Sequence, residues 1–333
     1  MLSFVLVFAI GFAAHRASLC TVRAVMQWLE KRKASVIVSF LKAAAWASLL
    51  AGVFVLFGLS IKGVPQTNGV WWLGILGGFV FGIGAAVNGG CSLSTLQQLA
   101  DGDSGMLLAI AGFVFGAAGV TAIEHLWLAP VVQARSLWWQ GFTPPQQVLL
   151  VGLLTAWAAG ELAVMWLGRD RSKSVWQRLG AGRYRLSFSA LILGVASGLL
   201  FLLEGAWTYT NYLRGQTMFL LFGVATPGWN RGLLAMALFL GMVASSLQRR
   251  SFRWCWPTAH DSLKRGIGGA LMGAGGGLVP GGNDTLLLVL IPTLSPQAIA
   301  TYVALLIGIG GVVLFMRRSA GAARPKDRYP LRG

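Results

Sequence analysis

The sequence predicts an all-α polytopic membrane protein of about nine net crossings, an inverted repeat whose broken half-helices meet near the membrane midplane. Three observations support this fold class: an apolar composition, basic clusters between the apolar runs, and glycine pairs inside two of the runs. Hydrophobic residues make up 56% of the 333 residues and charged residues 11%, whereas soluble domains carry roughly 25% charged residues. The mean hydropathy of +0.68 agrees with that assignment.

Basic residues separate the apolar runs. The clusters lie at residues 31–33, 169–185, 249–265 and 317–332. The net charge of +17 could indicate nucleic-acid binding, but Lys and Arg placed between spans are typical of loops that stay on the cytoplasmic side. We therefore expect a multi-pass protein with a cytoplasmic C-terminus that contacts the lipid bilayer and no nucleic acid.

The expected crossings alternate in direction along the chain. They cover residues 1–29, 36–59, 71–99, 106–123, 146–167, 187–225, 230–248, 266–295 and 298–316. This order divides the chain into a first transmembrane repeat (1–145), a linker span with a basic cytoplasmic loop (146–185), a second, inverted repeat (186–316) and a basic cytoplasmic tail (317–333). A single linker span between two equivalent blocks of four crossings inverts the second block.

Four of the expected crossings are broken: 1–29, 71–99, 187–225 and 266–295. The two blocks match best where residues 84–91 align with residues 276–283, sharing four positions that include a double glycine. Corresponding interrupted helices in two halves of a transporter point to a binding site at the midplane. The sequence therefore predicts a substrate path beside these breaks.

The break at Gly89 and Gly90 is the strongest candidate for a substrate site. Paired glycines release the backbone from helical geometry, and unpaired backbone groups at membrane depth are tolerated only where they are buried in protein or line a cavity. Cys91 then opens a second helical piece, where backbone N–H groups favour an anion. We expect a largely neutral Cys91 thiol that donates a weak S–H bond, with Ser92 beside it. The alternative is a small buried hydrophobic residue.

Other residues of the broken segments are further candidates. Arg16 either lines the path or extends to the interface. Glu204 is either a proton-coupling carboxylate or a cap facing the external vestibule. Asn283, which follows Gly281 and Gly282, either lines the path or caps a half-helix. The complete predicted substrate path comprises Arg16, Cys20, Gly89, Gly90, Cys91, Ser92, Glu204, Gly281, Gly282 and Asn283.

The polar residues also exclude several classes of function. Three cysteines without CxxC spacing and three scattered histidines indicate no disulfide framework, no metal site and no cofactor. No hydrolytic triad or nucleotide-binding loop appears, so we expect no enzyme activity and no ATP coupling in this chain. Cys255, next to aromatic anchors, reads as interfacial, and Glu161 is expected to make an interhelical hydrogen bond.

Two motifs about seventy residues apart, Ser18-Leu19-Cys20 and Gly89-Gly90-Cys91-Ser92, precede the later Gly281-Gly282 pair. Together they resemble the YeeE/YedE sulfur-transport family of bacterial inner-membrane proteins, over roughly residues 1–316. The resemblance implies a compact inverted-repeat bundle that takes up thiosulfate or a related sulfur anion. Three cysteines in such proteins touch the substrate through S–H hydrogen bonds, and a small cytoplasmic sulfur-carrier protein is often a partner.

The resemblance transfers to two of the three cysteine positions. Cys20 matches the first and Cys91 the second, whereas Asn283 stands after the later double glycine. An asparagine amide can also donate a hydrogen bond to an anion. The resemblance thus implies an inner-membrane permease for thiosulfate or a related sulfur-containing anion, with sulfite, another small anion or a selenium compound as alternatives. Two rival functions stay open: a sulfur-transferring thiol protein in which Cys91 forms a persulfide, and a scaffold that recruits a sulfur carrier.

Overall fold

The computed structural model describes residues 1–58, 72–127, 142–168, 180–223, 228–279 and 281–319. Within these ranges every regular element is a helix, which confirms the all-α prediction. The helices are α1 (Leu2–Ala17), α2 (Thr21–Lys31), α3 (Ser35–Leu56), α4 (Trp72–Asn88), α5 (Ser92–Ala100), α6 (Met106–Trp127), α8 (Pro144–Leu167), α10 (Leu186–Glu204), α11 (Tyr209–Phe222), α12 (Trp229–Arg249), α13 (Ala259–Leu278), α14 (Asn283–Thr285), the π-helix η1 (Leu286–Leu290) and α15 (Pro296–Ser319).

Eight stretches of the described chain are long and apolar enough to cross a membrane. They are Leu2–Lys31, Ser35–Leu56, Trp72–Ala100, Met106–Ile123, Pro144–Leu167, Leu186–Phe222, Trp229–Arg249 and Pro296–Ser319. These stretches match eight of the nine expected crossings. The expected crossing at 266–295 is not among them, and its helix α13 begins with the charged residues Asp261, Lys264 and Arg265. A polytopic membrane protein is therefore confirmed, while the count of nine stays a prediction.

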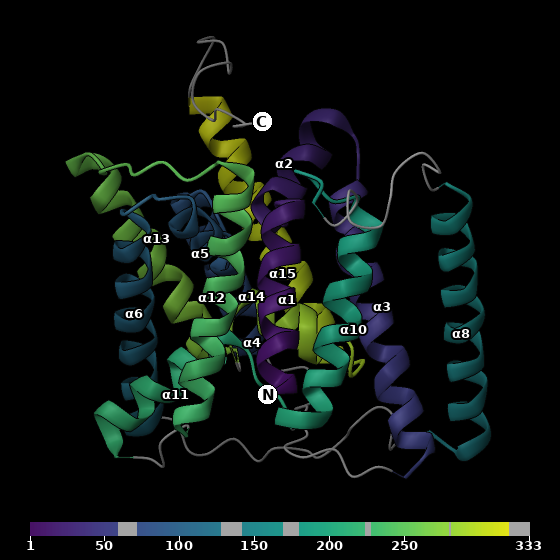
Figure 1. The fold of residues 1–333 in the computed structure, drawn as a ribbon. Helices are drawn as coiled ribbons and strands as arrows, with labels where there is room; N and C mark the ends of the chain where they lie inside the picture. The colour runs from purple at the N-terminus through teal and green to yellow at the C-terminus, as the bar shows by residue number, and fades with distance from the viewer. Residues whose placement is uncertain (59–71, 128–141, 169–179, 224–227, 280, 320–333) are drawn as a thin grey trace.

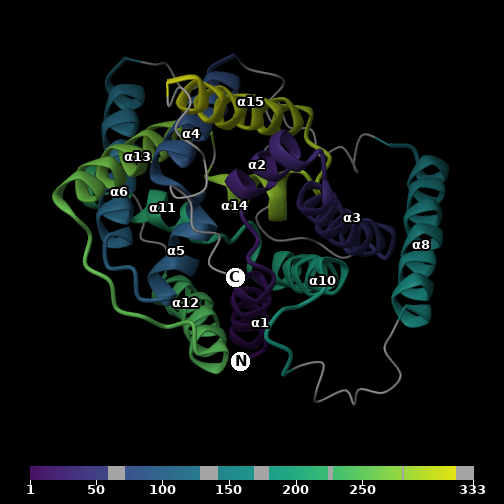
Figure 2. The same cartoon turned by 90° about the horizontal axis from the view of Figure 1, so that it is seen from above.

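The helices of the two halves interleave instead of forming separate bundles (Figures 1 and 2). Helix α1 packs against α12 and α10, and α10 packs against α3. Helix α4 packs against α13 and α15, and α13 packs against α6. If α1–α6 correspond to α10–α15, each of these contacts has a counterpart with the halves exchanged. The predicted inverted repeat would produce this pattern.

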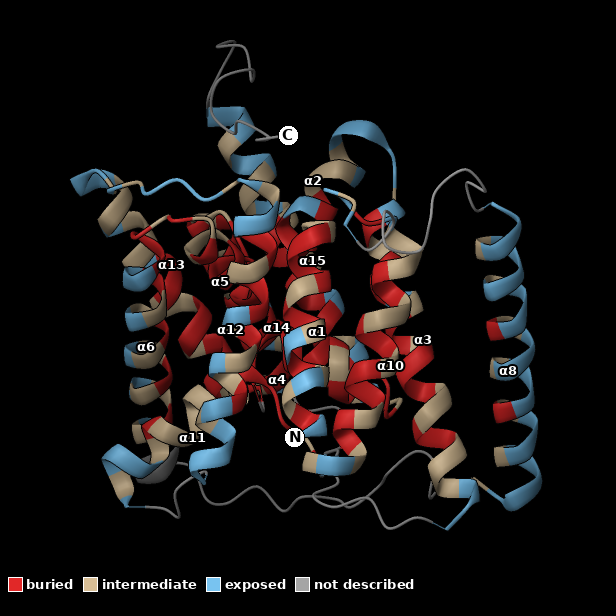
Figure 3. Cartoon of the chain, in the orientation of Figure 1, coloured by how far each residue is buried: buried red, intermediate tan, exposed pale blue. Residues whose placement is uncertain are grey.

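Glycines allow the central helices to approach closely. A Cβ atom on Gly82 of α4 would collide with the backbone oxygen of Leu305 on α15, and one on Gly308 would collide with that of Phe79. In lipid, helices associate mainly through van der Waals packing, and small residues at such crossings let the backbones approach closely enough for it. Buried residues accordingly concentrate in the middle of the bundle, whereas α8 stands at its edge and is mostly exposed (Figure 3).

Helix α8 is attached through α3. The Lys42 Nζ atom donates to Glu161 Oε1 at 2.6 Å, and the rings of Trp46 and Trp157 lie 5.5 Å apart. The interhelical hydrogen bond expected of Glu161 is therefore confirmed.

Basic residues gather at one end of the bundle. The α2–α3 turn, the end of α12 and the end of α15 all lie at the end opposite the N-terminus (Figure 1). Arg317 of α15 pairs there with Glu30 of α2. Most of the predicted basic loop and tail, at 169–179 and 320–333, falls outside the described residues. The described clusters follow the distribution expected of cytoplasmic loops.

Candidate functional site

Four helix breaks meet around the short helix α14, near the centre of the bundle (Figure 2). They separate α1 from α2, α4 from α5, α10 from α11, and α13 from α14. Each break contains one residue with positive φ: Ser18, Gly89, Gly205 and Gly281. At Gly281 the φ of +113° and the close Thr285 side chain leave no room for a Cβ atom. Breaks thus occur within all four crossings that the sequence predicts to be broken, and the second lies at the predicted residues 89–90.

The two predicted cysteines come together at this junction. Cys91 is fully buried and Cys20 is 7% exposed. The two thiols interact with each other, and the Ser94 hydroxyl lies beside the Cys20 thiol. Cys91 is the N-cap of α5, but its side chain makes no capping hydrogen bond. Its thiol is therefore available to a neighbouring group.

Asn283 approaches the same point from the opposite half. Its Nδ2 atom donates to Thr21 Oγ1 at 2.9 Å, and Thr21 directly follows Cys20 in the chain. The residue is 1% exposed, and its Oδ1 atom has no hydrogen-bond partner among the described residues. Tyr302 of α15 also faces Thr21 and the thiols, and its hydroxyl is buried.

The backbone of the breaks brings the predicted glycines and Ser92 to this cluster. The Gly282 N–H donates to Thr210 Oγ1 at 2.7 Å, which ties the α13–α14 break to the α10–α11 break. Gly90 follows the left-handed Gly89, and its carbonyl accepts from Asn88 Nδ2 at 3.0 Å. The two glycine pairs and Ser92 therefore belong, with Cys20, Cys91 and Asn283, to the breaks that meet around α14.

Arg16 lies away from the thiols. It is buried in the protein, and its guanidinium donates to the Ala181 carbonyl and to Gln248 Oε1. The guanidinium also lies 4.9 Å from the centre of the Phe12 ring and 5.6 Å from that of Tyr184. Such contacts fasten the end of α1 to the end of α12.

Glu204 lies at the end of α10, where its Oε1 atom accepts from Ser3 Oγ at 2.6 Å. Ser3 belongs to the first turn of α1, at the N-terminal end of the bundle (Figure 1). Neither Glu204 nor Arg16 has a described contact with the cysteines or with Asn283.

The predicted substrate path does not include Asp284. Asp284 is 5% exposed and accepts from the Thr210 hydroxyl at 2.6 Å and from Ser92 Oγ at 3.3 Å. An ionisable residue inside a membrane segment is a signal that could have found it. Thr21, Ser94 and Tyr302 gave no such signal, because hydroxyl side chains are ordinary in packed membrane helices.

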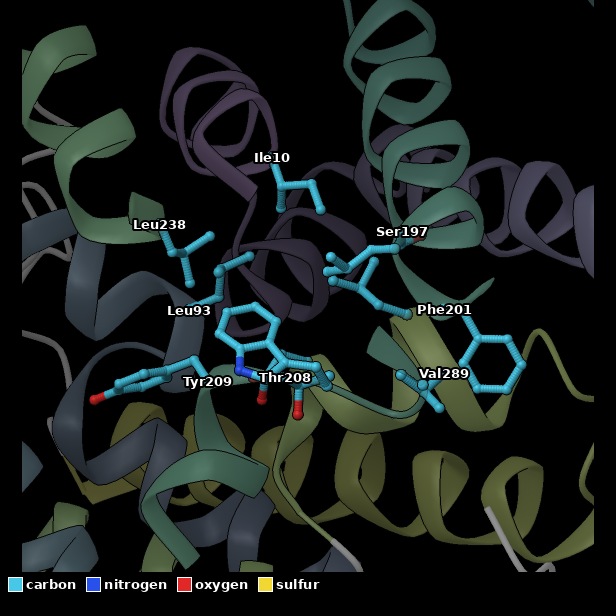
Figure 4. A pocket seen from close by; sticks show the side chains of 13 residues that line it. Ile10, Leu93, Ser197, Phe201, Thr208, Tyr209, Leu238 and Val289 are labelled. Atoms are coloured by element: carbon cyan, nitrogen blue, oxygen red, sulfur yellow. The ribbon is translucent and has the colours of Figure 1, made fainter. Parts of the chain in front are cut away.

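A pocket adjoins this cluster (Figure 4). Residues of α1, α5, α10, α12, η1 and the α10–α11 break surround it, and Asp284 is part of its wall. Figure 4 shows Leu93, Thr208 and Tyr209 around the space, with Ile10 and Leu238 on another side. The pocket is thus a mostly apolar chamber that ends at polar groups.

The cluster can offer weak, neutral hydrogen-bond donors to an anion. The described residues contain no group of three His, Cys, Asp or Glu side chains placed to hold a metal ion. Donors of this kind replace part of the hydration of an ion without holding it tightly, as conduction along a narrow path requires.

Two comparisons with known proteins bear on this site. A family model described as Sulphur transport matches residues 16–311. The thiosulfate transporter TsuA of Escherichia coli (strain K12) is 24% identical over 267 residues, which cover 72% of this chain and 73% of that protein. The matched region of the family model includes all four helix breaks.

Proposed function

Because this chain belongs to the Sulphur transport family, we propose that it carries thiosulfate, or a closely related sulfur anion, across a bacterial inner membrane. Membership of the family and the apolar helices make it a multi-pass sulfur transporter. The likeness to a thiosulfate transporter supports the choice of substrate. The clustering of described basic residues at one end supports a cytoplasmic C-terminus.

The proposed path runs from the pocket through the junction of the breaks to the basic end. One observation carries this proposal: the buried thiols of Cys20 and Cys91 meet where four helix breaks converge. Thiols donate weakly and become anionic only at some cost when buried, so a neutral pair suits a passing anion. Selectivity would follow from the narrow bore and from the number of donors.

Asn283 supplies the third contact in this proposal. Its Nδ2 atom donates to Thr21 Oγ1, so its oxygen is the atom left without a partner. A 180° rotation of the amide would let the Thr21 hydroxyl donate to Oδ1 instead and would turn the Nδ2 donors toward the path. Asparagine can therefore stand in for a third thiol at this position.

Uptake in a sulfur-limited bacterium tests the proposal. The strain lacks its own sulfur uptake systems and expresses this chain, with thiosulfate, sulfite or sulfate supplied separately. We expect growth on thiosulfate that is lost in Cys20→Ala and Cys91→Ala. Cys255→Ser is the matched control, because Cys255 is joined to its neighbours through its backbone N–H and carbonyl.

The same assay separates the rival functions. Growth retained by Cys91→Ser would exclude a persulfide on Cys91 and any need for its thiol. Normal expression without growth on thiosulfate would contradict the proposed substrate. The sulfur-carrier partner implied by the family resemblance stays a prediction, and purified chain with a candidate carrier would test it.

A further inference from the structure

Asp284 is a buried carboxyl group with only neutral donors around it. Its Oδ1 atom accepts from Thr210 Oγ1 at 2.6 Å and from Ser92 Oγ at 3.3 Å, and its Oδ2 atom accepts from the Thr210 N–H at 3.1 Å. Burying an ionised carboxylate is costly unless a cation or several donors compensate. Here hydrogen bonds stabilise the group without neutralising its charge.

Among the described residues, the hydrogen-bond partners of Asp284 are the neutral residues Ser92 and Thr210. The titratable groups that face it are the Tyr209 phenol of α11 and, beyond Ser92, the Cys91 thiol with its partner Cys20. No described Lys, Arg or His side chain is hydrogen-bonded or ion-paired to it. Apart from Tyr209, the other residues that line the pocket beside it are apolar residues, a glycine, a serine and a threonine, and none of them is titratable.

Asp284 occupies the boundary between the pocket and the thiol pair. It lines the pocket on one side, and on the other it is hydrogen-bonded to Ser92, the residue after Cys91. Its chain neighbour Asn283 contacts Thr21, the residue after Cys20. The carboxyl group of Asp284 therefore lies beside both the pocket and the residues that adjoin the thiols.

Two like charges repel strongly in a medium of low dielectric constant. A protonated Asp284 removes that repulsion and presents an O–H donor instead. We infer that Asp284 takes up a proton from the pocket side when an anion passes, so that the protein moves a proton together with its sulfur anion. The inference rests on the proposed function.

The proton step needs no other reactant. The carboxylate gains a proton on the pocket side, forming one O–H bond, and releases it on the far side of the site. No bond of the anion forms or breaks.

A sodium ion is the rival coupling ion. The oxygens near Asp284 already hydrogen-bond one another, with 2.6 Å between the hydroxyls of Thr208 and Thr285 and 3.2 Å between those of Thr210 and Thr285. These hydroxyls are engaged with one another, so a cation could bind them only by breaking their hydrogen bonds. The geometry thus favours a proton.

The full chain in proteoliposomes tests the inference. Radiolabelled thiosulfate is added outside, a pH-sensitive dye reports the lumen, and potassium with valinomycin clamps the voltage. We expect the lumen to acidify in step with thiosulfate uptake, and uptake to accelerate when the outside is made more acidic. In Asp284→Asn, the acidification per thiosulfate taken up and the response of uptake to external pH fall at least about tenfold.

Matched variants keep the result decisive. Asp284→Glu retains a titratable group and should keep acidification, which separates loss of the proton site from misfolding. Glu204→Gln removes the other candidate carboxylate and should keep coupling. Thiosulfate uptake without acidification, coupling to sodium instead, or coupling lost only in Glu204→Gln would overturn the inference. Absence of any thiosulfate uptake by the wild-type chain would instead overturn the proposed function.

Discussion

The side-chain amide of Asn283 donates a hydrogen bond to the hydroxyl of Thr21 across 2.9 Å, although 262 positions separate the two residues. The contact joins the break between α13 and α14 to the start of α2, directly beside Cys20. Asn283, which stands where the family resemblance implies a third cysteine, is therefore held close to Cys20, which matches the first.

Replacing Asn283 with leucine should strongly reduce transport. The change keeps the branching of the side chain but removes both donors and leaves Thr21 without its amide partner. Loss of one hydrogen bond to a charged ligand costs about 1.5–3 kcal/mol, which predicts a fall in uptake of about ten- to a hundredfold. Asn283→Cys should retain uptake, because a thiol is also a donor. Initial rates of thiosulfate uptake, normalised to membrane expression, measure both effects, and full activity of the leucine variant would contradict the role of Asn283.

The reactivity of the three thiols should differ sharply. Cys91 and Cys20 are buried, whereas Cys255 is partly exposed in the segment between α12 and α13. A hydrophilic maleimide should label Cys255 in the folded, detergent-solubilised chain and reach the other two only after denaturation. Mass spectrometry of Cys255→Ser before and after unfolding checks this, and rapid labelling of the folded variant would show a path far wider than the structure has.

Glycines of α6 provide a paired test of helix packing. A Cβ atom on Gly116 would collide with the backbone oxygen of Ala270 on α13, whereas one on Gly119 would meet nothing within 4 Å. Gly116→Ala should therefore destabilise the fold by about 1–3 kcal/mol, because the two helices must separate. Gly119→Ala should be neutral or stabilising by up to ~1 kcal/mol. Thermal unfolding in detergent compares them, and equal melting temperatures would contradict the close α6–α13 contact.

The parts of the fold that could be predicted are those that local sequence patterns determine. Apolar runs and glycine pairs are local, so most helices and the breaks near Cys20 and Cys91 could be predicted. The break at residues 205–208 could be placed only within a long apolar segment, since a single glycine, Gly205, supplies its positive φ. The π-helix at residues 286–290 has no pattern of its own, since its residues are all apolar.

The composition of the site could be predicted only in part. Cys91 and Asn283 stand out because each follows a glycine pair in an apolar run, and Cys20 because it ends the Ser18-Leu19-Cys20 motif. The hydrogen bond between Asp284 and Thr210 joins residues 74 positions apart, and no local pattern encodes such a contact. Arg16 and Glu204 were singled out for their charge, but their partners, Gln248 and Ser3, also lie far away in sequence.

Asp101, just after α5, ties three segments together at the basic end of the bundle. Its Oδ1 atom accepts from Ser251 Oγ at 2.6 Å and from Ser246 Oγ at 2.7 Å, and it lies 3.1 Å from His15 Nε2. Burial by itself would raise the pKa of Asp101, but the hydrogen bonds from His15 and the two serines outweigh it and lower that pKa to about 2. Because its side chain is 38% exposed, solvent screening limits the gain in stability.

This lowered pKa predicts a pH-dependent effect of Asp101→Asn. A carboxyl group whose pKa is lower in the folded than in the unfolded chain stabilises the fold above the unfolded pKa, about 3.9 for Asp. That contribution is lost as the pH falls through the folded value near 2. The variant should thus unfold at a lower temperature than the wild type between pH 5 and 8, and the difference should shrink between about pH 4 and 2. Intrinsic tryptophan fluorescence during heating in detergent measures it. A difference independent of pH over that window would show that Asp101 acts through its shape and not through its charge.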